Sequence, residues 1–410
     1  MLSAIFSRRG FRISIYSVVV PILLQLFYVR YISYNVDKSF FGNYILYISF
    51  VALIASLLFS IPHVALTRYI NQTSNKERFV NEFMTLQIPL NVVGVIMIYL
   101  YSVYANTGFD IFIILSIYFV LLTRYSINKI VIFQLIKRKQ FFNISVLEKL
   151  ARFFFPVLIF YFFQSSNALL YGLLFGYLIL VTYSSYQLNN FQQKFFFSFR
   201  KLKIYILFGY PIMLTNLAVW IISLSDRYYI ENYVGKSIVG EYSIIAQVAG
   251  FSSILASIFT VYVQPIIFKK FSVDKNEAMK NYLSYVNKSL IVFIPMYIVF
   301  LFTPLEVFTI IISPSIILND DYFYIFHILV LASILVSYVT ILTNIFILNN
   351  MMLTLSKYWL IASLFTIFGN SLIDTYGVYA VAFTKMLAYL LILLFMYFSI
   401  NRLMTNKYSE

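Results

Sequence analysis

Positively charged side chains inside long apolar segments are the residues of this chain whose chemistry is most specific. Arg124, Arg152 and Lys385 each stand several turns away from the ends of such segments. An ionised side chain is expensive inside a bilayer, so these residues usually line a polar path or pair with another charge. Guanidinium and ammonium groups are strong donors to phosphate and carboxylate oxygens. The sequence therefore predicts a site for an anion.

The two arginines lie at equal distances on either side of the basic segment 137–139, which predicts similar depths on consecutive helices. Asn128 follows Arg124 by about one helical turn and shares its face. We expect Arg124, Asn128 and Arg152 to bind substrate together with Lys385. The alternative for the two arginines is that they join helices by donating to backbone carbonyls.

The other intramembrane charges differ from the two arginines in their predicted surroundings. Lys385 lies eight residues after Gly377, near the middle of its span, and has no partner visible in the sequence. Glu148 is predicted to form a structural ion pair with Lys129 or Lys149. Asp226 and Arg227 follow an apolar segment; they either latch a gate with Arg30 or cap a hairpin.

The composition requires a membrane environment for these charges. Of 410 residues, 61% are hydrophobic and 20% aromatic, whereas 11% are charged. This is more apolar surface than a soluble domain can bury, so we expect a polytopic all-α membrane protein. The chain has no cysteine, which excludes disulfides and thiolate metal sites. We expect no cofactor and no metal.

Apolar segments of about 20 residues, the length of a membrane-spanning helix, predict twelve transmembrane helices. The predicted spans are 13–34, 42–62, 83–105, 110–134, 142–163, 168–188, 205–225, 240–263, 283–303, 323–345, 355–373 and 377–400.

The net charge of +15 is explained by topology rather than by nucleic-acid binding. Lysines and arginines concentrate in every second loop between the predicted spans, and the alternate loops carry mainly acidic residues. Basic loops stay on the cytoplasmic side. Both termini are therefore predicted to be cytoplasmic, and nucleic acid is not an expected partner.

A short motif occurs once in each half of the chain. Lys38, Ser39, Gly42 and Tyr44 match Lys236, Ser237, Gly240 and Tyr242 in order and spacing. Two six-helix repeats predict a two-lobed transporter, with an N-terminal lobe at 1–200 and a C-terminal lobe at 201–410. We expect the two glycines to allow close packing at a helix start, with ligand contact as the alternative.

The segment 209–250, GYPIMLTNLAVWIISLSDRYYIENYVGKSIVGEYSIIAQVAG, resembles the seventh and eighth helices of Wzx-type O-antigen flippases. These belong to the multidrug/oligosaccharidyl-lipid/polysaccharide (MOP) exporter superfamily. Its pattern there is Gly-x-Pro, Ser-Asp-Arg-Tyr and Gly-x-x-x-Val-Gly-x-Tyr. Weaker similarity extends to 40–44 and 369–385, so the motifs cover about a tenth of the chain.

The resemblance implies a MATE-like transporter of the bacterial inner membrane that is not an enzyme. It would flip an undecaprenyl-pyrophosphate-linked O-antigen or other polysaccharide repeat unit from the cytoplasmic to the periplasmic leaflet. Expected partners are the polyprenyl-pyrophosphate-linked oligosaccharide, membrane lipids and other membrane proteins of polysaccharide assembly.

Two other functions are weighed against the flippase. A cation-coupled multidrug or solute antiporter of the same superfamily predicts acidic residues deep in one lobe, and none is visible at mid-bilayer in the sequence. A membrane O-antigen polymerase predicts a large periplasmic loop, whereas the longest predicted outer loop is 304–322. No arrangement of His, Asp, Glu and Ser in the sequence indicates catalysis.

Overall fold

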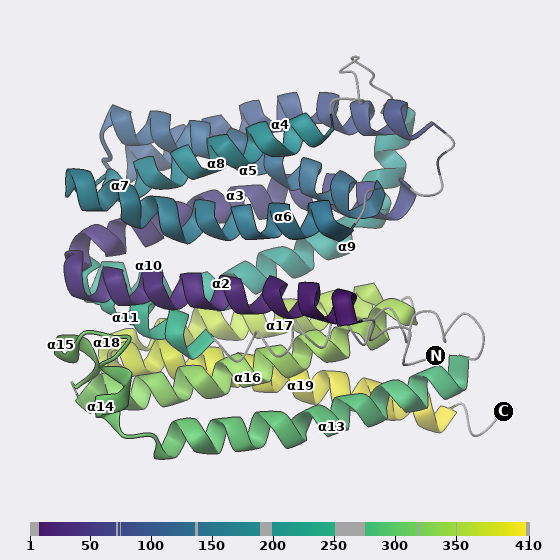
Figure 1. The fold of residues 1–410 in the computed structure, drawn as a ribbon. Coiled ribbons are helices and arrows are strands. Elements are labelled where there is room, and N and C mark those ends of the chain that lie inside the picture. Colours follow the sequence, from purple (N-terminus) through teal and green to yellow (C-terminus); the bar gives the residue numbers. More distant parts are fainter. Residues whose placement is uncertain are drawn as a thin grey trace. The chain divides into compact units, whose positions relative to one another are not determined.

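The chain is an all-α, multi-pass membrane protein. Its structure, a computed structural model, describes residues 8–70, 73, 75–135, 138–188, 199–250, 275–318, 320–349 and 351–406. These residues form helices and no β-strand (Figure 1). Within them, eight helices are long and apolar enough to cross a bilayer.

In the first half of the chain, the described residues form α-helices and one π-helical turn. They are α2 (Arg8–Asn35), α3 (Lys38–Tyr69), α4 (Lys76–Tyr104), α5 (Phe109–Leu135), α6 (Arg138–Lys149), a π-helical turn (Leu150–Phe154), α7 (Phe155–Phe163), α8 (Ala168–Gln187) and α9 (Phe199–Leu224).

In the second half, the described residues form four short helices near the loops and four long ones besides α11. In order they are α10 (Asp226–Tyr233), α11 (Lys236–Ala249), α13 (Lys275–Phe302), α14 (Leu305–Phe308), α15 (Pro314–Ile317), α16 (Asp320–Leu348), α17 (Met352–Asn370), α18 (Ile373–Tyr376) and α19 (Val378–Asn406).

Each of the twelve predicted spans has a helical counterpart, with two differences of consequence. The fifth span is interrupted by the π-helical turn Leu150–Phe154. The seventh span does not end at residue 225, because α10 continues it to Tyr233. The eighth span is described only as far as residue 250, and the chain ends 1–7 and 407–410 also fall outside the described residues.

The chain divides into two compact units. Unit 1 comprises Met1–Ile32 and Asn43–Leu217, and unit 2 comprises Ser33–Gly42 and Ala218–Glu410. The predicted lobes 1–200 and 201–410 stay a prediction.

In unit 1, α8 packs against α5, α7 and the π-helical turn. The close approach depends on Gly172 and Gly176: a Cβ atom added at either would lie 2.5 Å from the Phe155 carbonyl oxygen or 2.6 Å from the Ala151 Cα. Side chains on the outer faces of α4 and α5 are apolar and exposed, as lipid contact requires. Glycines thus fix α8 directly against the segment that carries Arg152.

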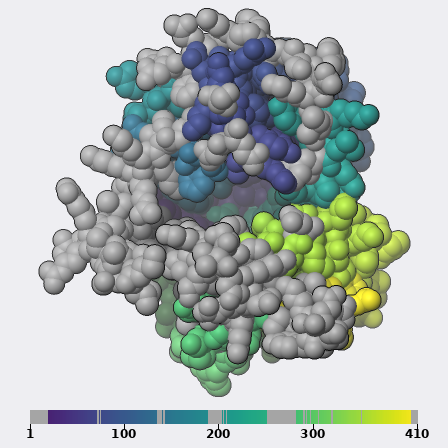
Figure 2. All heavy atoms as spheres, turned by 90° about the vertical axis from the view of Figure 1, so that its right-hand side faces the viewer, coloured from purple at the N-terminus to yellow at the C-terminus, as the bar shows by residue number. Residues whose placement is uncertain are grey.

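In unit 2, α16 is the central helix. It packs against α19, α13, α11 and α17, and about two thirds of the residues in its most apolar part are buried. In the space-filling view, yellow-green atoms of the α17 region lie beside yellow atoms of α19 (Figure 2). Helix α19 therefore runs between α16 and α17, and it positions Lys385 toward the interior of the unit.

The repeated motif brings the starts of α3 and α11 together. A Cβ atom added to Gly42 would lie 2.0 Å from the Lys236 carbonyl oxygen, and one added to Gly240 would lie 2.1 Å from the Lys38 carbonyl oxygen. The two contacts are reciprocal, as expected for equivalent residues of a repeat. The prediction that these glycines allow close packing at helix starts is confirmed.

Candidate functional site

Arg152 lies in the π-helical turn of unit 1 and is exposed, whereas its neighbours Ala151 and Phe153 are buried. A π-helical turn adds one residue to the helix and often marks a functional position. Here it changes which face of the segment carries the guanidinium. Arg152 thus lies inside the predicted fifth span and is exposed, and its role in binding substrate stays a prediction.

Tyrosine hydroxyls surround this arginine. The guanidinium of Arg152 interacts electrostatically with Tyr28 of α2, Tyr44 of α3 and both Tyr118 and Tyr177, which lie on α5 and α8. The rings of Tyr118 and Tyr177 meet edge to face at a centroid distance of 5.1 Å. All four tyrosines are buried. One guanidinium is therefore accessible among hydroxyl donors from four helices.

The Tyr177 hydroxyl is fully buried and has no hydrogen-bond partner of normal geometry in the part of the chain that the structure describes. A buried hydroxyl without a partner is destabilising by about 1–3 kcal/mol. Its presence beside Arg152 indicates unused hydrogen-bonding capacity at this place.

Glu148 is the carboxylate nearest to Arg152 in sequence, and it is already paired. Its Oε2 atom accepts from the Lys129 ammonium at 2.6 Å and from the Tyr125 hydroxyl at 2.9 Å. The predicted Lys129–Glu148 ion pair is therefore present. Glu148 also interacts electrostatically with Arg152 and Lys149, so three cations share one carboxylate. The region keeps a surplus of positive charge.

Arg124 is half-buried on α5 and has no hydrogen bond or ion pair with any described residue. No electrostatic interaction between Arg124 and Arg152 is found among the described residues, although their positions in the sequence predict similar depths. The next residue, Tyr125, faces Glu148, and successive helical residues point about 100° apart. Arg124 therefore faces another side of α5, and the structure does not bring the two arginines together.

Asn128 has no accessible surface. Its side-chain amide donates to the hydroxyls of Ser184 at 3.0 Å and Ser185 at 3.1 Å, both on α8. These hydrogen bonds join α5 to α8. In this conformation Asn128 holds two helices together and offers no surface to a substrate.

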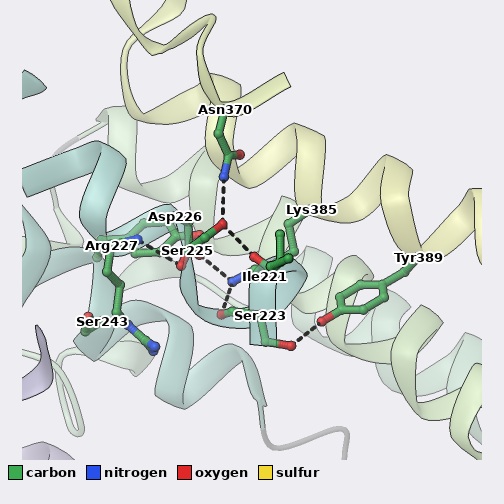
Figure 3. A network of polar contacts seen from close by, with 10 residues as sticks. Ile221, Ser223, Ser225, Asp226, Arg227, Ser243, Asn370, Lys385 and Tyr389 are labelled. Carbon is green, nitrogen blue, oxygen red and sulfur yellow. Dashed lines mark hydrogen bonds and ion pairs between the residues drawn. The ribbon is translucent and has the colours of Figure 1, made fainter. Parts of the chain in front are cut away.

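Unit 2 contains a buried polar cluster at the junction of α9 and α10, which faces α17 and α19 (Figure 3). The Lys385 ammonium forms an ion pair with Oδ2 of Asp226 and donates to the Ser223 carbonyl oxygen at 2.9 Å. Lys385 is 8% exposed and Asp226 only 1%. The expectation of an unpaired mid-membrane lysine is wrong.

The correction has a simple geometric cause. The seventh span was predicted to end at residue 225, with Asp226 at the outer mouth of the transporter. Because α10 extends the helical path to Tyr233, Asp226 lies seven residues, or about 10 Å, inside the end of that path. This depth matches that of Lys385 on α19.

The same cluster includes groups that the sequence did not single out. The Tyr242 hydroxyl donates to Oδ2 of Asp226 at 2.7 Å, and the Asn370 amide donates to the Ser225 hydroxyl at 3.3 Å. The hydroxyls of Ser223 and Tyr389 lie 2.9 Å apart. Polar contacts around one carboxylate thus join five helices, which are α9, α10, α11, α17 and α19.

The predicted gate residues lie in different environments. Arg227 is half-buried and its Nε donates to the Ser243 hydroxyl at 3.2 Å. Arg30 is exposed on α2 and belongs to unit 1, whereas Asp226 and Arg227 belong to unit 2. The Asp226 carboxylate contacts Lys385 and Tyr242 within unit 2. The gate role of Arg30, Asp226 and Arg227 stays a prediction.

The repeat contained a signal for the missed tyrosines. Tyr44 and Tyr242 are equivalent residues, each two positions after its glycine. Tyr44 faces Arg152 in unit 1, and Tyr242 faces Asp226 and Lys385 in unit 2. The matched tyrosine therefore lies beside an intramembrane charge in each unit. No group of three or more His, Asp or Glu residues suited to a metal occurs in the described ranges.

Solved structures of similar fold include a lipid flippase and several transporters. The lipid II flippase MurJ in an inward closed conformation has a TM-score of 0.72 and 14% identity, covering 95% of this chain and 86% of that chain. An inward-facing multidrug resistance MATE family transporter of the MOP superfamily has a TM-score of 0.62 and 13% identity, covering 95% and 99%. A MOP superfamily transporter from Pyrococcus furiosus has a TM-score of 0.54 and 13% identity, covering 95% and 93%. The chain therefore has a MurJ/MATE-like fold, as the seventh-helix motif predicted.

No curated protein sequence matches the chain. A family model described as polysaccharide biosynthesis protein matches residues 92–318, which is more than half of the chain. These residues include Arg124, Arg152 and Asp226. The chain belongs to this polysaccharide biosynthesis protein family.

Proposed function

We propose that the chain is a flippase of the bacterial inner membrane. It moves undecaprenyl-pyrophosphate-linked O-antigen or other polysaccharide repeat units from the cytoplasmic to the periplasmic leaflet by alternating access of two lobes. The family, the fold shared with MurJ, and the cationic interior of unit 1 support this proposal. A transporter with both termini in the cytoplasm accounts for the distribution of basic loops.

The observation that carries the proposal is the accessible guanidinium of Arg152 among tyrosine hydroxyls. A flipped lipid-linked sugar takes a pyrophosphate and a hydrated headgroup through the membrane. Guanidinium groups bind phosphate oxygens in a bidentate geometry, and tyrosine hydroxyls add further donors. Tyrosine rings also offer apolar faces against which sugar rings pack.

Arg124 is a second phosphate-binding candidate because no described residue compensates its charge. Lys385 and Asn128 are weaker candidates in this conformation, since Lys385 is paired with Asp226 and Asn128 is inaccessible. The substrate site that we propose therefore centres on Arg152, with Arg124 as a separate contact.

The test uses vesicles that contain the purified full-length protein and a lipid-linked oligosaccharide. An impermeant probe reports how much headgroup reaches the opposite leaflet. We expect protein-dependent accessibility, reduced about tenfold or more in Arg152→Ala, because charge-assisted hydrogen bonds contribute about 1.5–3 kcal/mol. Lys288→Ala is the matched control, since Lys288 is an exposed cation on α13.

One observation favours the cation-coupled antiporter as a second candidate: Asp226 is an acidic residue buried inside a transmembrane path, although Lys385 already compensates its charge. Proton- or sodium-driven efflux of a small cation, without flipping of a verified matching glycan, would favour that alternative. Equal flipping by Arg152→Ala and Lys288→Ala would remove Arg152 from the substrate site.

A further inference from the structure

The Lys385 ammonium occupies an oxygen-rich site in unit 2. Its neighbours are a carboxylate oxygen of Asp226 and the carbonyl oxygen of Ser223. Carboxylate and backbone carbonyl oxygens are also the usual protein ligands of hard metal cations. An ammonium and a dissolved monovalent cation therefore have similar requirements at this place.

The Ser223 carbonyl is available because the helix is locally rearranged at Asp226. In a regular α-helix this carbonyl would accept from the backbone N–H of Arg227, four residues later. That N–H instead donates to Oδ1 of Asp226 at 3.0 Å. The carbonyl lies in the last turn of α9, where helix carbonyls carry partial negative charge. The break between α9 and α10 thus prepares an oxygen atom for a cation.

A further acceptor lies beside these atoms. Asn370 is fully buried and its amide hydrogens point toward the Ser225 hydroxyl (Figure 3). Its Oδ1 has no hydrogen-bond partner in the described part of the chain. Asn370 thus carries an unused acceptor on a side chain that contacts Ser225, the residue before Asp226.

The charge balance of the cluster leaves no room for an additional cation. Asp226 is the carboxylate, and Lys385 supplies one positive charge. Arg227 interacts electrostatically with Lys385 and adds a second. A buried carboxylate requires compensation, but this one is already compensated in excess.

We infer that the Asp226 cluster is a monovalent-cation site whose occupant is the chain's own Lys385 ammonium. Because the Lys385 ammonium is covalently attached to α19, the stability of unit 2 does not depend on Na+ or on other dissolved cations. This inference goes beyond the proposed function, because it does not depend on what the protein transports. It also means that Asp226 does not couple transport to a sodium gradient while Lys385 is present.

The test removes the Lys385 side chain and supplies a cation from solution. Purified full-length Lys385→Ala is compared with the wild type by thermal unfolding in detergent. Sodium chloride or propylammonium chloride replaces choline chloride at constant ionic strength. Propylammonium reproduces the atoms removed between Cγ and Nζ. Breaking a buried ion pair is expected to lower the melting temperature by about 10 °C in choline.

We expect Na+ or propylammonium to restore at least half of this loss in Lys385→Ala, with a saturable dose dependence. The wild type should show no such response. The double variant Asp226→Asn/Lys385→Ala should not respond either, because it lacks the carboxylate. Lys129→Ala controls for ion-pair loss in general, since its partner Glu148 is partly accessible.

Two results would overturn the inference. One is a saturable stabilisation of the wild type by Na+, which would show that Asp226 accepts a dissolved cation beside Lys385. The other is a Lys385→Ala variant that no cation restores. If that variant does not fold in any cation while the Asp226→Asn/Lys385→Ala double variant folds, a dissolved cation cannot replace the ammonium, and the inference is equally wrong.

Discussion

Replacing Gly240 by alanine is expected to destabilise unit 2 by pushing α3 and α11 apart. The new Cβ would stand 2.1 Å from the Lys38 carbonyl oxygen. Non-bonded carbon and oxygen atoms stay more than about 3 Å apart, so the two backbones must separate by about 1 Å. Overpacking costs about 1–3 kcal/mol, and a rigid backbone neighbour favours the upper end. Alanine regains about 1 kcal/mol through its helix propensity. The net loss should be about 2 kcal/mol.

The reciprocal contact makes a sharper prediction for the double variant. Gly42→Ala strains the same helix pair, because its Cβ would stand 2.0 Å from the Lys236 carbonyl oxygen. Once one substitution has separated the helices, the second meets a smaller obstacle. The double variant should therefore lose about 1 kcal/mol less than the sum of the single losses.

Thermal unfolding of the purified protein measures this cycle, and Gly250→Ala is the control. Gly250 caps α11, and a Cβ there would meet nothing within 4 Å. Additive losses in the double variant would refute the reasoning, since they would mean that the two glycines act at separate contacts. Equal stability of Gly240→Ala and Gly250→Ala would refute the contact itself.

Three further substitutions test the packing around the site. Gly377→Ala should lower stability by about 1–3 kcal/mol, because Gly377 has a φ of 60° and a ψ of −152°, a region open essentially to glycine alone; thermal unfolding measures the loss. Tyr177→Phe should leave stability unchanged or raise it by about 1 kcal/mol, because the buried hydroxyl makes no hydrogen bond of normal geometry with any described residue; a clear loss in melting temperature would contradict this. Glu148→Gln should destabilise less than Asp226→Asn, because the Lys129 partner of Glu148 reaches solvent whereas Lys385 does not; denaturation of both variants side by side decides the order.

The long apolar segments made the helical fold predictable. Their positions predicted a helix for each span, although several helices extend well beyond the predicted bounds. The repeated Lys-Ser-x-x-Gly-x-Tyr predicted the close packing at Gly42 and Gly240. Both follow from strong local constraints. A span must cover the hydrocarbon, and a backbone contact excludes every residue with a Cβ.

Partners across the fold were harder to predict because depth alone does not define direction. The positions of Arg124 and Arg152 in the sequence predict similar depths in the membrane, yet the structure does not bring the two side chains together. The π-helical turn at Leu150–Phe154 shifts the register of its segment by one residue, and the sequence contains no sign of it. Ion pairs depend on this register as much as on depth.

The Asp226–Lys385 pair was missed for a related reason. The polar sequence after residue 225 suggested a loop, whereas α10 continues the helical path with Asp226 on its buried side. An aspartate that begins an amphipathic turn, followed four residues later by the buried Ile230, was the available signal. It predicts an inward-facing carboxylate, which in a membrane requires a cationic partner.

The two units differ in how they compensate their buried charges, and this difference bears on function. In unit 2 the Asp226 carboxylate has a cation within the chain. In unit 1, three cations share Glu148, and Arg124 has no partner among the described residues. A cation antiporter needs an uncompensated carboxylate, whereas a carrier of pyrophosphate needs uncompensated cations. The described residues of unit 1 leave an excess of positive charge, and under the proposed function a lipid-linked pyrophosphate would compensate it.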